Sequence, residues 1–390
     1  MKKKVFVGLS GGVDSSVAAY LLKQATPNNF SKLFGRPTPK GFRGYDVYGV
    51  HLRCWNRGGC DVVEAEYARR TAEYLDIPFY IFDLEKEYKR AVVDYMVKGY
   101  KQGITPNPDV MCNKEIKFGL FLKKALEFGA DYVATGHYVR LKRLPDAFAQ
   151  GVSGATPKSY PSQKHRASLH IARDKTKDQS YFLWTLTQEQ LKHSLFPIGG
   201  YLKSEVRKIA KKAGLPSADK KDSQGICFLG QVTLRDFLGE YLPKKKGNIT
   251  DVNGQVLGKH DGIQFYTIGQ RHGLKIASDL PYYVADKDVK TNTLVVAKGS
   301  DNPSLYQKEI ILTNINFINT LAPSLIRANR RIRILCRVRY RQLLFSASLS
   351  VVGASRLRIT FDRSQKFIAP GQSAVFYDKS GEMLGGGVIV

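Results

Sequence analysis

The stretch that decides the fold is Gly8-Leu-Ser-Gly-Gly-Val-Asp-Ser-Ser16, which directly follows the apolar run Val5-Phe6-Val7. The residues after it, 17–22, have the apolar spacing of a helix. Glycines at 11 and 12 permit a tight turn with exposed N–H groups, and the serines add hydroxyl donors where the helix dipole is positive. This order of strand, glycine loop and helix predicts a site for a polyphosphate anion.

The loop is not a Walker loop, because no lysine follows its glycines in the order Gly-Lys-Ser/Thr. Ser10-Gly-Gly-Val-Asp-Ser15 instead resembles the loop of ATP pyrophosphatases, which cleave ATP between its first two phosphates. The resemblance implies adenylation chemistry and not kinase or GTPase chemistry.

Length and composition indicate a globular protein of two or three domains: the chain has 390 residues, of which 43% are hydrophobic. No stretch approaches the roughly 20 apolar residues of a membrane span. Met1-Lys-Lys-Lys4 runs straight into the first predicted strand, so we expect no signal peptide and a cytoplasmic location. Five cysteines in a chain of this size argue for individual thiols and against a disulfide scaffold, and no zinc-ligand spacing is visible.

Charge points to a polyanionic partner, because 61 Lys and Arg against 34 Asp and Glu leave a formal net charge of +27. No acidic residue occurs between Ile310 and Thr360. In Arg331-Ile-Arg-Ile-Leu-Cys-Arg-Val-Arg-Tyr-Arg341, arginines alternate with mostly apolar residues. Period-two alternation predicts a strand with guanidinium groups on one face, facing phosphates, and apolar groups in a core.

The pattern of elements predicts an α/β N-terminal domain built on a doubly wound parallel sheet, with its ligand at the carboxyl ends of the strands. We expect strands at 5–9, 46–52, 78–84 and 131–135, and helices at 62–75, 85–100, 114–128, 179–190, 202–213 and 233–241. Segments 26–44 and 145–166 are rich in Pro, Gly, Ser and Lys and are interpreted as surface insertions. Asp251-Val-Asn-Gly254 indicates a hairpin, and short β-branched runs after 307 indicate a small barrel. The predicted domains are 1–229, a small mixed central domain at 230–304, and an all-β barrel at 305–390.

Two cysteines lie in polar loops. Cys112 lies in Asn107-Pro-Asp-Val-Met-Cys-Asn-Lys-Glu115, just before a predicted helix for which Asn113 is a plausible N-cap. A thiol at a helix N-terminus would have its thiolate favoured, and Asp109 is close enough in sequence to act as an acid or base. An isolated cysteine is more often a small buried apolar residue, but the cap-forming setting favours exposure here.

The second thiol is Cys227, in Asp222-Ser-Gln-Gly-Ile-Cys-Phe-Leu-Gly230. In an ATP pyrophosphatase with an arginine-rich strand, two loop thiols are a more specific signal than either alone. One thiol can carry a sulfane sulfur, and the other can resolve it by forming a disulfide.

Motifs along the whole chain together resemble the tRNA-specific 2-thiouridylases, a family of tRNA-uridine 2-sulfurtransferases. They are Ser10-Gly-Gly-Val-Asp-Ser15, Asn107 to Phe118, Ala134-Thr-Gly-His-Tyr-Val-Arg140, Lys177-Asp-Gln-Ser-Tyr-Phe182, Ser223-Gln-Gly-Ile-Cys-Phe228, Thr267-Ile-Gly-Gln-Arg271 and Pro370-Gly-Gln-Ser373. The resemblance implies 2-thiolation of the wobble uridine of tRNA, with persulfide on Cys227, Cys112 as the nucleophile that pairs with it, and Asp109 assisting proton transfer.

The resemblance also implies the binding residues. ATP would be held by Gly8, Leu9, Ser10, Gly11, Gly12, Val13, Asp14 and Ser15, with Leu52 and Gly136 near the nucleotide. The tRNA would be met by Asn107, Pro108, Asp109, His137, Lys177, Asp178, Gln179, Arg339, Tyr340 and Gln372. We expect Mg²⁺ on the triphosphate and no other metal. The expected partners are the tRNA anticodon arm and a persulfide donor, which is a cysteine desulfurase or a relay protein. We expect the protein to be a monomer without membrane contact.

Two other functions fit parts of the sequence. A small-molecule ligase of the same class, in the manner of argininosuccinate or GMP synthetases, explains residues 10–15 but neither the two thiols nor the arginine strand. A non-catalytic RNA-binding protein with a vestigial nucleotide fold explains the arginines but not the intact loop or the pairing of Cys112 with Asp109.

Overall fold

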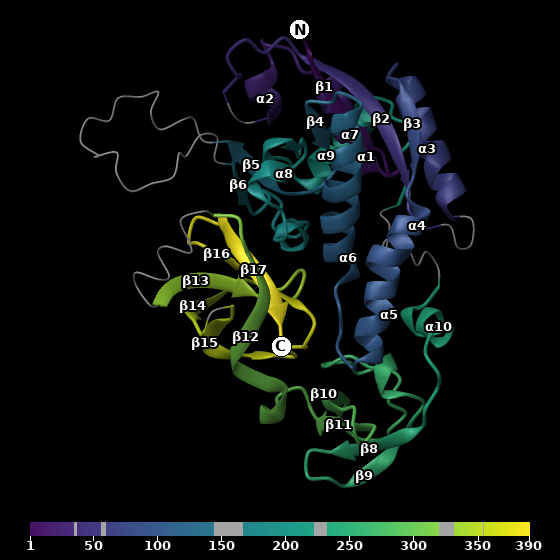
Figure 1. The fold of residues 1–390 in the computed structure, drawn as a ribbon, viewed down its shortest axis with the longest axis vertical. Helices are drawn as coiled ribbons and strands as arrows, with labels where there is room; N and C mark the ends of the chain where they lie inside the picture. The colour runs from purple at the N-terminus through teal and green to yellow at the C-terminus, as the bar shows by residue number, and fades with distance from the viewer. Residues whose placement is uncertain (35–36, 56–59, 144–166, 222–231, 320–330, 354) are drawn as a thin grey trace, which may run out of the picture.

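The computed structural model describes residues 1–390 except 35–36, 56–59, 144–166, 222–231, 320–330 and 354 (Figure 1). A parallel sheet with helices forms the N-terminal part, a small sheet the middle part, and a closed barrel the C-terminal part. This is the predicted architecture. Among the helices of these described residues, none has both the length and the apolar character that crossing a bilayer requires.

The N-terminal sheet has the strand order β3-β2-β1-β4-β7, and all its pairs are parallel. Its strands are β1 (Lys3–Gly8), β2 (Tyr45–Arg53), β3 (Phe79–Asp83), β4 (Tyr132–Ala134) and β7 (Ser194–Leu195). The chain runs outward from β1 in one direction and then returns to β4 on its other side. A sheet of this kind binds its ligand where that reversal occurs, which places the site at the ends of β1 and β4.

Helices cover both faces of this sheet because β1 alternates between two cores. Val5 and Val7 pack with α1 (Val13–Lys23), α3 (Cys60–Tyr74) and α9 (Lys203–Lys212). Phe6 belongs to the opposite core, which contains residues of the long helix after Asn107. The smaller N-terminal elements are α2 (Phe30–Phe34), β5 (Arg140–Arg143), β6 (Ala167–His170), the 3₁₀ helix η3 (Ser180–Leu183) and α8 (Gln188–Lys192).

The long helix begins six residues earlier than expected. Asn107, not Asn113, is its N-cap: the Asn107 side chain accepts a hydrogen bond from the Val110 amide at 3.2 Å, and Pro108 occupies the first turn. The helix continues as α6 (Pro108–Met111), the π-helical segment η2 (Cys112–Phe121) and α7 (Leu122–Glu127). The predicted helix at 85–100 is similarly divided, into α4 (Glu85–Tyr88), the π-helical η1 (Lys89–Val93) and α5 (Asp94–Lys101). The prediction of a single helix over 179–190 was wrong, because η3 and α8 are separate helices.

The first predicted insertion is packed where it is described. Phe30 of α2 is fully buried, and its ring lies 4.8 Å from that of Phe34 and 4.7 Å from that of Phe42. Aromatic burial, which the polar composition of 26–44 concealed, therefore holds this segment against the domain. The second predicted insertion, 145–166, lies outside the described residues.

The middle part forms a four-stranded sheet in the order β10-β11-β8-β9, preceded by α10 (Leu234–Gly239). The hairpin signal at 251–254 is confirmed, since β8 (Gly247–Asp251) and β9 (Val256–His260) pair antiparallel. The other elements are the 3₁₀ helix η4 (Ile263–Phe265), β10 (Tyr282–Asp288), β11 (Thr293–Lys298) and the 3₁₀ helix η5 (Pro303–Leu305).

The C-terminal part is a closed antiparallel barrel in the order β12-β15-β14-β13-β16-β17. Its strands are β12 (Tyr306–Phe317), β13 (Arg331–Arg337), β14 (Phe345–Val351), β15 (Leu357–Lys366), β16 (Ser373–Tyr377) and β17 (Met383–Ile389). Closure pairs the edges that an open sheet would expose.

The arginine strand follows the predicted alternation only in part. Ile334 and Cys336 lie in the barrel core as expected, but β13 ends at Arg337 and does not reach 341. The expectation that Arg337 faces phosphates was wrong: its side chain is buried against the N-terminal part, where Asp178 supplies the opposite charge. The outward face of a barrel strand became an interface because another domain covers it.

Two adjacent glycines after β7 provide a test of the packing within the N-terminal part. A Cβ on Gly199 would lie 1.8 Å from the Val139 carbonyl oxygen, whereas a Cβ on Gly200 would meet nothing within 4 Å. We expect Gly199→Ala to lower the free energy of unfolding by about 1–3 kcal/mol, the usual cost of overpacking. Gly200→Ala should be neutral or slightly stabilising. Denaturant unfolding of both variants measures this, and equal unfolding free energies would contradict the close approach.

Candidate active site

The phosphate loop lies between β1 and α1, where the sequence predicted it. Gly11 has φ +71°, and a Cβ there would lie 2.4 Å from the Glu64 carbonyl oxygen, so only glycine fits. Gly12 is the N-cap residue of α1. The Ser15 hydroxyl accepts from the Ser10 amide at 3.2 Å and donates to the Gly12 carbonyl at 3.0 Å. The loop is thus braced from within, with the N-terminus of α1 at its centre.

Two lysines from a distant segment meet this loop. Lys203 Nζ contacts both carboxylate oxygens of Asp14 at 2.8 and 2.9 Å, and the Tyr138 hydroxyl donates to Asp14 at 2.8 Å. Lys220 Nζ lies 2.7 Å from the Glu64 carboxylate and 3.4 Å from the Gly11 carbonyl oxygen. They bring to the loop the positive charge that a Walker loop carries on its own lysine. Sequence analysis missed both, because nothing in their local spacing marks them.

The ends of β2 and β4 approach the same loop. A Cβ on Gly136 would lie 2.7 Å from the Asp14 carbonyl carbon and the Ser15 nitrogen, so this backbone rests directly on the loop. Leu52 lies two residues beyond Val50, whose carbonyl accepts from the Leu9 amide at 2.7 Å. The structure therefore brings Gly136 against the predicted nucleotide residues and places Leu52 on the neighbouring strand.

Cys112 lies one helical turn after Asp109, at the start of η2. The prediction that its setting keeps it exposed was wrong: the side chain is 4% exposed and belongs to an apolar core that includes Tyr88 and Ile116. Burial raises the pKa of the Cys112 thiol, Lys117 opposes this shift, and Asp109 adds to it. The helix starts at Pro108, so the thiol does not sit at the N-terminal amides that would have favoured the thiolate. A π-helical turn often marks a functional site, and here it begins at the thiol.

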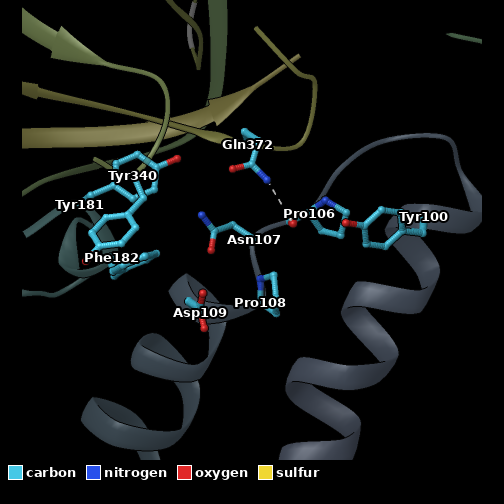
Figure 2. A pocket seen from close by; sticks show the side chains of 9 residues that line it. All are labelled: Tyr100, Pro106, Asn107, Pro108, Asp109, Tyr181, Phe182, Tyr340 and Gln372. Carbon is cyan, nitrogen blue, oxygen red and sulfur yellow. Dashed lines mark hydrogen bonds between the residues drawn. The ribbon is translucent and has the colours of Figure 1, made fainter. Parts of the chain in front are cut away.

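An aromatic pocket of about 230 Å³ opens beside Asp109 (Figure 2). It is lined by Tyr100, Pro106, Asn107, Pro108, Asp109, Tyr181, Phe182, Tyr340 and Gln372. Four of these nine side chains are aromatic, and a base is a flat ring that stacks on such surfaces. The pocket therefore suits an extruded nucleobase next to a carboxylate.

The barrel supplies one wall of this pocket. The Tyr340 ring lies 4.4 Å from the Phe182 ring, and the Gln372 amide donates to the carbonyls of Thr105 at 2.9 Å and Pro106 at 3.3 Å. Figure 2 shows Gln372 reaching from the barrel loop to the segment before Asn107. Tyr340 and Gln372 thus join Asn107, although more than 200 residues separate them in sequence.

Several of the remaining predicted residues do not line the pocket and are held by contacts elsewhere. Gln179 accepts from the Tyr138 amide at 3.0 Å, and Asp178 is buried in an ion pair with Arg337. Arg339 is half-buried and donates to the Ile268 carbonyl at 2.6 Å, which ties the barrel to the middle part. Lys177 is not one of the residues that line the pocket, and Cys227 lies outside the described residues.

His137 is buried, and its Nδ1 lies 2.8 Å from the Thr135 hydroxyl. Burial, together with the charge of Lys117, lowers the pKa of His137 well below its ordinary value. The imidazole is therefore neutral at pH 7 and can offer a hydrogen bond but no positive charge.

Comparison with known proteins agrees with this geometry. Residues 3–35 and 40–231 match the family model described as tRNA methyl transferase HUP domain, 235–298 match the tRNA methyl transferase PRC-barrel domain, and 307–389 match the aminomethyltransferase beta-barrel domain. The chain is 41% identical to the tRNA-specific 2-thiouridylase MnmA of Lysinibacillus sphaericus (strain C3-41), over 99% of this chain and 94% of that protein. It is 43% identical to the protein of that name from Listeria monocytogenes serotype 4b (strain CLIP80459), with the same coverage.

Among solved structures, the chain is similar to the U34-tRNA thiolase NcsA from Methanococcus maripaludis. The TM-score is 0.34, with 19% identity over 62% of this chain and 67% of the other, a likeness too low to carry an argument.

The parallel sheet, its phosphate loop and the two β domains place the chain in the class of HUP-domain proteins with a PRC-barrel and a C-terminal β-barrel. At more than 40% identity over nearly its whole length, the chain belongs to the tRNA-specific 2-thiouridylase family.

The charges around Cys112 predict how its thiol titrates. Because burial raises its pKa, the thiol is protonated at pH 7, and its alkylation should be slow and should rise with pH beyond the range of an ordinary cysteine. Asp109→Asn removes a nearby negative charge and should lower the pKa and speed alkylation at pH 8. Lys117→Met should do the reverse.

Mass spectrometry of the Cys112 peptide after timed iodoacetamide treatment measures these rates, with half-buried Cys54 as internal reference. Slower alkylation of Cys112 in Asp109→Asn would contradict the assignment of charges.

Proposed function

We propose that the chain 2-thiolates the wobble uridine of tRNA, using ATP to activate the base and a cysteine persulfide as sulfur source. The observation that carries the proposal is the aromatic pocket beside Asp109, which lies at the start of the helix bearing Cys112. Membership of the 2-thiouridylase family supports it. An anticodon base leaves its stack at low cost, so the pocket can receive it.

In the first step, the uridine 2-oxygen attacks the α-phosphorus of ATP and pyrophosphate leaves. The product is an adenylated base with AMP as its leaving group. The residues proposed for this step are Gly8 to Ser15, whose amides and hydroxyls at the N-terminus of α1 would surround the phosphates. Lys203 and Lys220 add positive charge beside them.

In the second step, the terminal sulfur of the Cys227 persulfide attacks C2, Asp109 takes its proton, and AMP departs. The Cys112 thiolate then attacks Cys227 Sγ and breaks the S–S bond, which leaves the sulfur on C2. The sulfane sulfur gains two electrons, and the two cysteines lose them as they form a disulfide. A thiol reductant must therefore restore both cysteines, and a persulfide donor must reload Cys227.

Mg²⁺ would neutralise the triphosphate when the nucleotide is bound. In the described part of the chain, no three His, Cys, Asp or Glu side chains gather as a metal site. Asp14 is paired with Lys203 and Tyr138. The ligands of the ion would therefore come mainly from phosphate oxygens and water, as is common for Mg²⁺.

The burial of Cys112 fits the resolving role in this order of events. A protonated, enclosed thiol does not react with outside oxidants, and the positive charge of Lys117 nearby opposes the burial that raises its pKa. The two rival functions leave this arrangement unexplained. A small-molecule ligase needs no aromatic wall from a barrel, and an RNA-binding protein needs no acid next to a thiol.

The thiol variants test the sulfur chemistry. Cys112→Ser and Cys227→Ser should each abolish 2-thiouridine formation and leave tRNA binding nearly intact, because both thiols have chemical and not anchoring roles. Nucleoside mass spectrometry of tRNA incubated with ATP and a persulfide source measures the product, and filter binding measures the complex. Normal thiolation by Cys227→Ser would overturn the carrier role, and Cys336→Ser is the matched control, since that thiol lies in the barrel core.

Substitution in the phosphate loop tests the nucleotide chemistry. Gly11→Val should remove ATP consumption, because its side chain would meet the Glu64 backbone and force the loop away from the phosphates. Gly200→Ala should consume ATP normally. Chromatography of the products should show AMP and pyrophosphate for the active proteins, and ADP as the main product would refute adenylation.

A further inference from the structure

The buried ion pair between Asp178 and Arg337 joins the two walls of the aromatic pocket. The Arg337 side chain is 5% exposed and that of Asp178 is 3% exposed. Asp178 comes from the N-terminal part, just before the 3₁₀ helix η3, and Arg337 is the last residue of barrel strand β13. Neither lines the pocket.

Both carboxylate oxygens of Asp178 accept hydrogen bonds. One carboxylate oxygen accepts from the Ala172 and Ser180 amides at 2.9 and 3.3 Å, and the other accepts from the Ser180 hydroxyl at 2.9 Å and from Arg337. Arg337 also donates to the Ser180 hydroxyl at 3.1 Å and to the Tyr377 hydroxyl at 3.0 Å. A buried network in which both carboxylate oxygens of Asp178 have partners favours one arrangement of the groups around it.

Each partner leads directly to one wall. From Asp178 the chain enters η3, which carries Tyr181 and Phe182 to the pocket, and from Arg337 it continues three residues to Tyr340. The Tyr340 ring lies 4.4 Å from that of Phe182 and 6.4 Å from that of Tyr181. The ion pair between Asp178 and Arg337 therefore lies where the two segments that carry these rings meet.

The same turn is tied to the phosphate loop. The Gln179 amide donates to the Tyr138 carbonyl at 2.9 Å, its side chain accepts from the Tyr138 amide, and the Tyr138 hydroxyl donates to Asp14. A shift of the turn would therefore move the aromatic wall relative to both the barrel and the loop.

We propose that Asp178 and Arg337 are positioning residues that hold the barrel's Tyr340 against Phe182, so that these rings form one fixed aromatic surface on which the extruded base stacks. In this role they act through these rings, because neither side chain lines the pocket. The inference rests on the proposed thiolation, since it names what sets the shape of the base pocket. Removing one partner leaves the other charge buried and unpaired, and the turn must open to hydrate it.

The test compares Arg337→Gln with Arg173→Gln. Arg173 lies close to the same turn and forms an ion pair with Glu205 at 3.0 Å, but the two side chains are 52% and 38% exposed. Both variants lose one positive charge, so long-range attraction of tRNA changes equally. We expect Arg337→Gln to raise the KM for tRNA in 2-thiouridine formation about tenfold or more, the scale of one lost base–aromatic stack. The ATP dissociation constant should change less than about twofold, and Arg173→Gln should leave both near the wild-type values.

Further variants separate positioning from general instability. Asp178→Asn in the Arg337→Gln background removes both charges and should bring the raised tRNA KM part of the way back to the wild-type value. A variant that had merely lost its fold would not be restored by a second substitution. If Arg337→Gln does not fold, Tyr377→Phe replaces it in the test. This variant deletes a single hydroxyl of the network and should raise the tRNA KM by a smaller factor. Assays run well below the melting temperature of each variant.

The outcomes are distinct. If the wild-type protein forms no 2-thiouridine with tRNA, ATP and persulfide, the proposed function falls. If the wild type is active and Arg337→Gln, or Tyr377→Phe in its place, matches Arg173→Gln, the positioning role alone is overturned. An unchanged tRNA KM with a weakened ATP affinity would likewise overturn it.

Discussion

The arrangement of the site depends on one close contact, that of the barrel loop before β16 on the segment before Asn107. Gly371 has φ +89°, and a Cβ there would lie 2.9 Å from the Thr105 carbonyl oxygen. The Thr105 amide donates to the Pro370 carbonyl at 2.9 Å, and the Gln372 side chain caps the same segment. This contact fixes the entry into the helix that carries Asp109 and Cys112, so the acid and the thiol are positioned by a domain that begins 200 residues later.

The sequence predicted the parts of the molecule that follow from local pattern. Strand, glycine loop and helix at 5–22 were confirmed, because the backbone conformation there is dictated by residues within a few positions. The barrel was confirmed for a similar reason, since alternation placed Ile334 and Cys336 in its core. Leu52 and Gly136 came from family resemblance, and their roles stay predictions.

What the sequence could not predict arises from contacts between distant segments. Arg337 has the same local pattern as the other arginines of its strand, and only the fold brings Asp178 to it. Lys203 and Lys220 likewise could not be assigned to the phosphate loop from sequence, because only the fold pairs them with Asp14 and Glu64. Cys112 was misjudged because exposure was inferred from polar neighbours in sequence, whereas its neighbours in space include Tyr88 and Ile116.

The π-helical segment η2 resolves a conflict between the two ends of one helix. Phe118 and Phe121 must face the sheet, while Asp109 must face the pocket and Cys112 must follow it. A uniform α-helix turns about 100° per residue, which fixes the angle between any two side chains by their separation. The wider turn changes that angle without ending the helix, and Gly119 allows it: a Cβ there would lie 2.9 Å from the Lys114 carbonyl oxygen. The segment therefore sets the angle at which the side chains before it face relative to those after it, so a residue inserted into or removed from η2 would rotate Asp109 relative to α7.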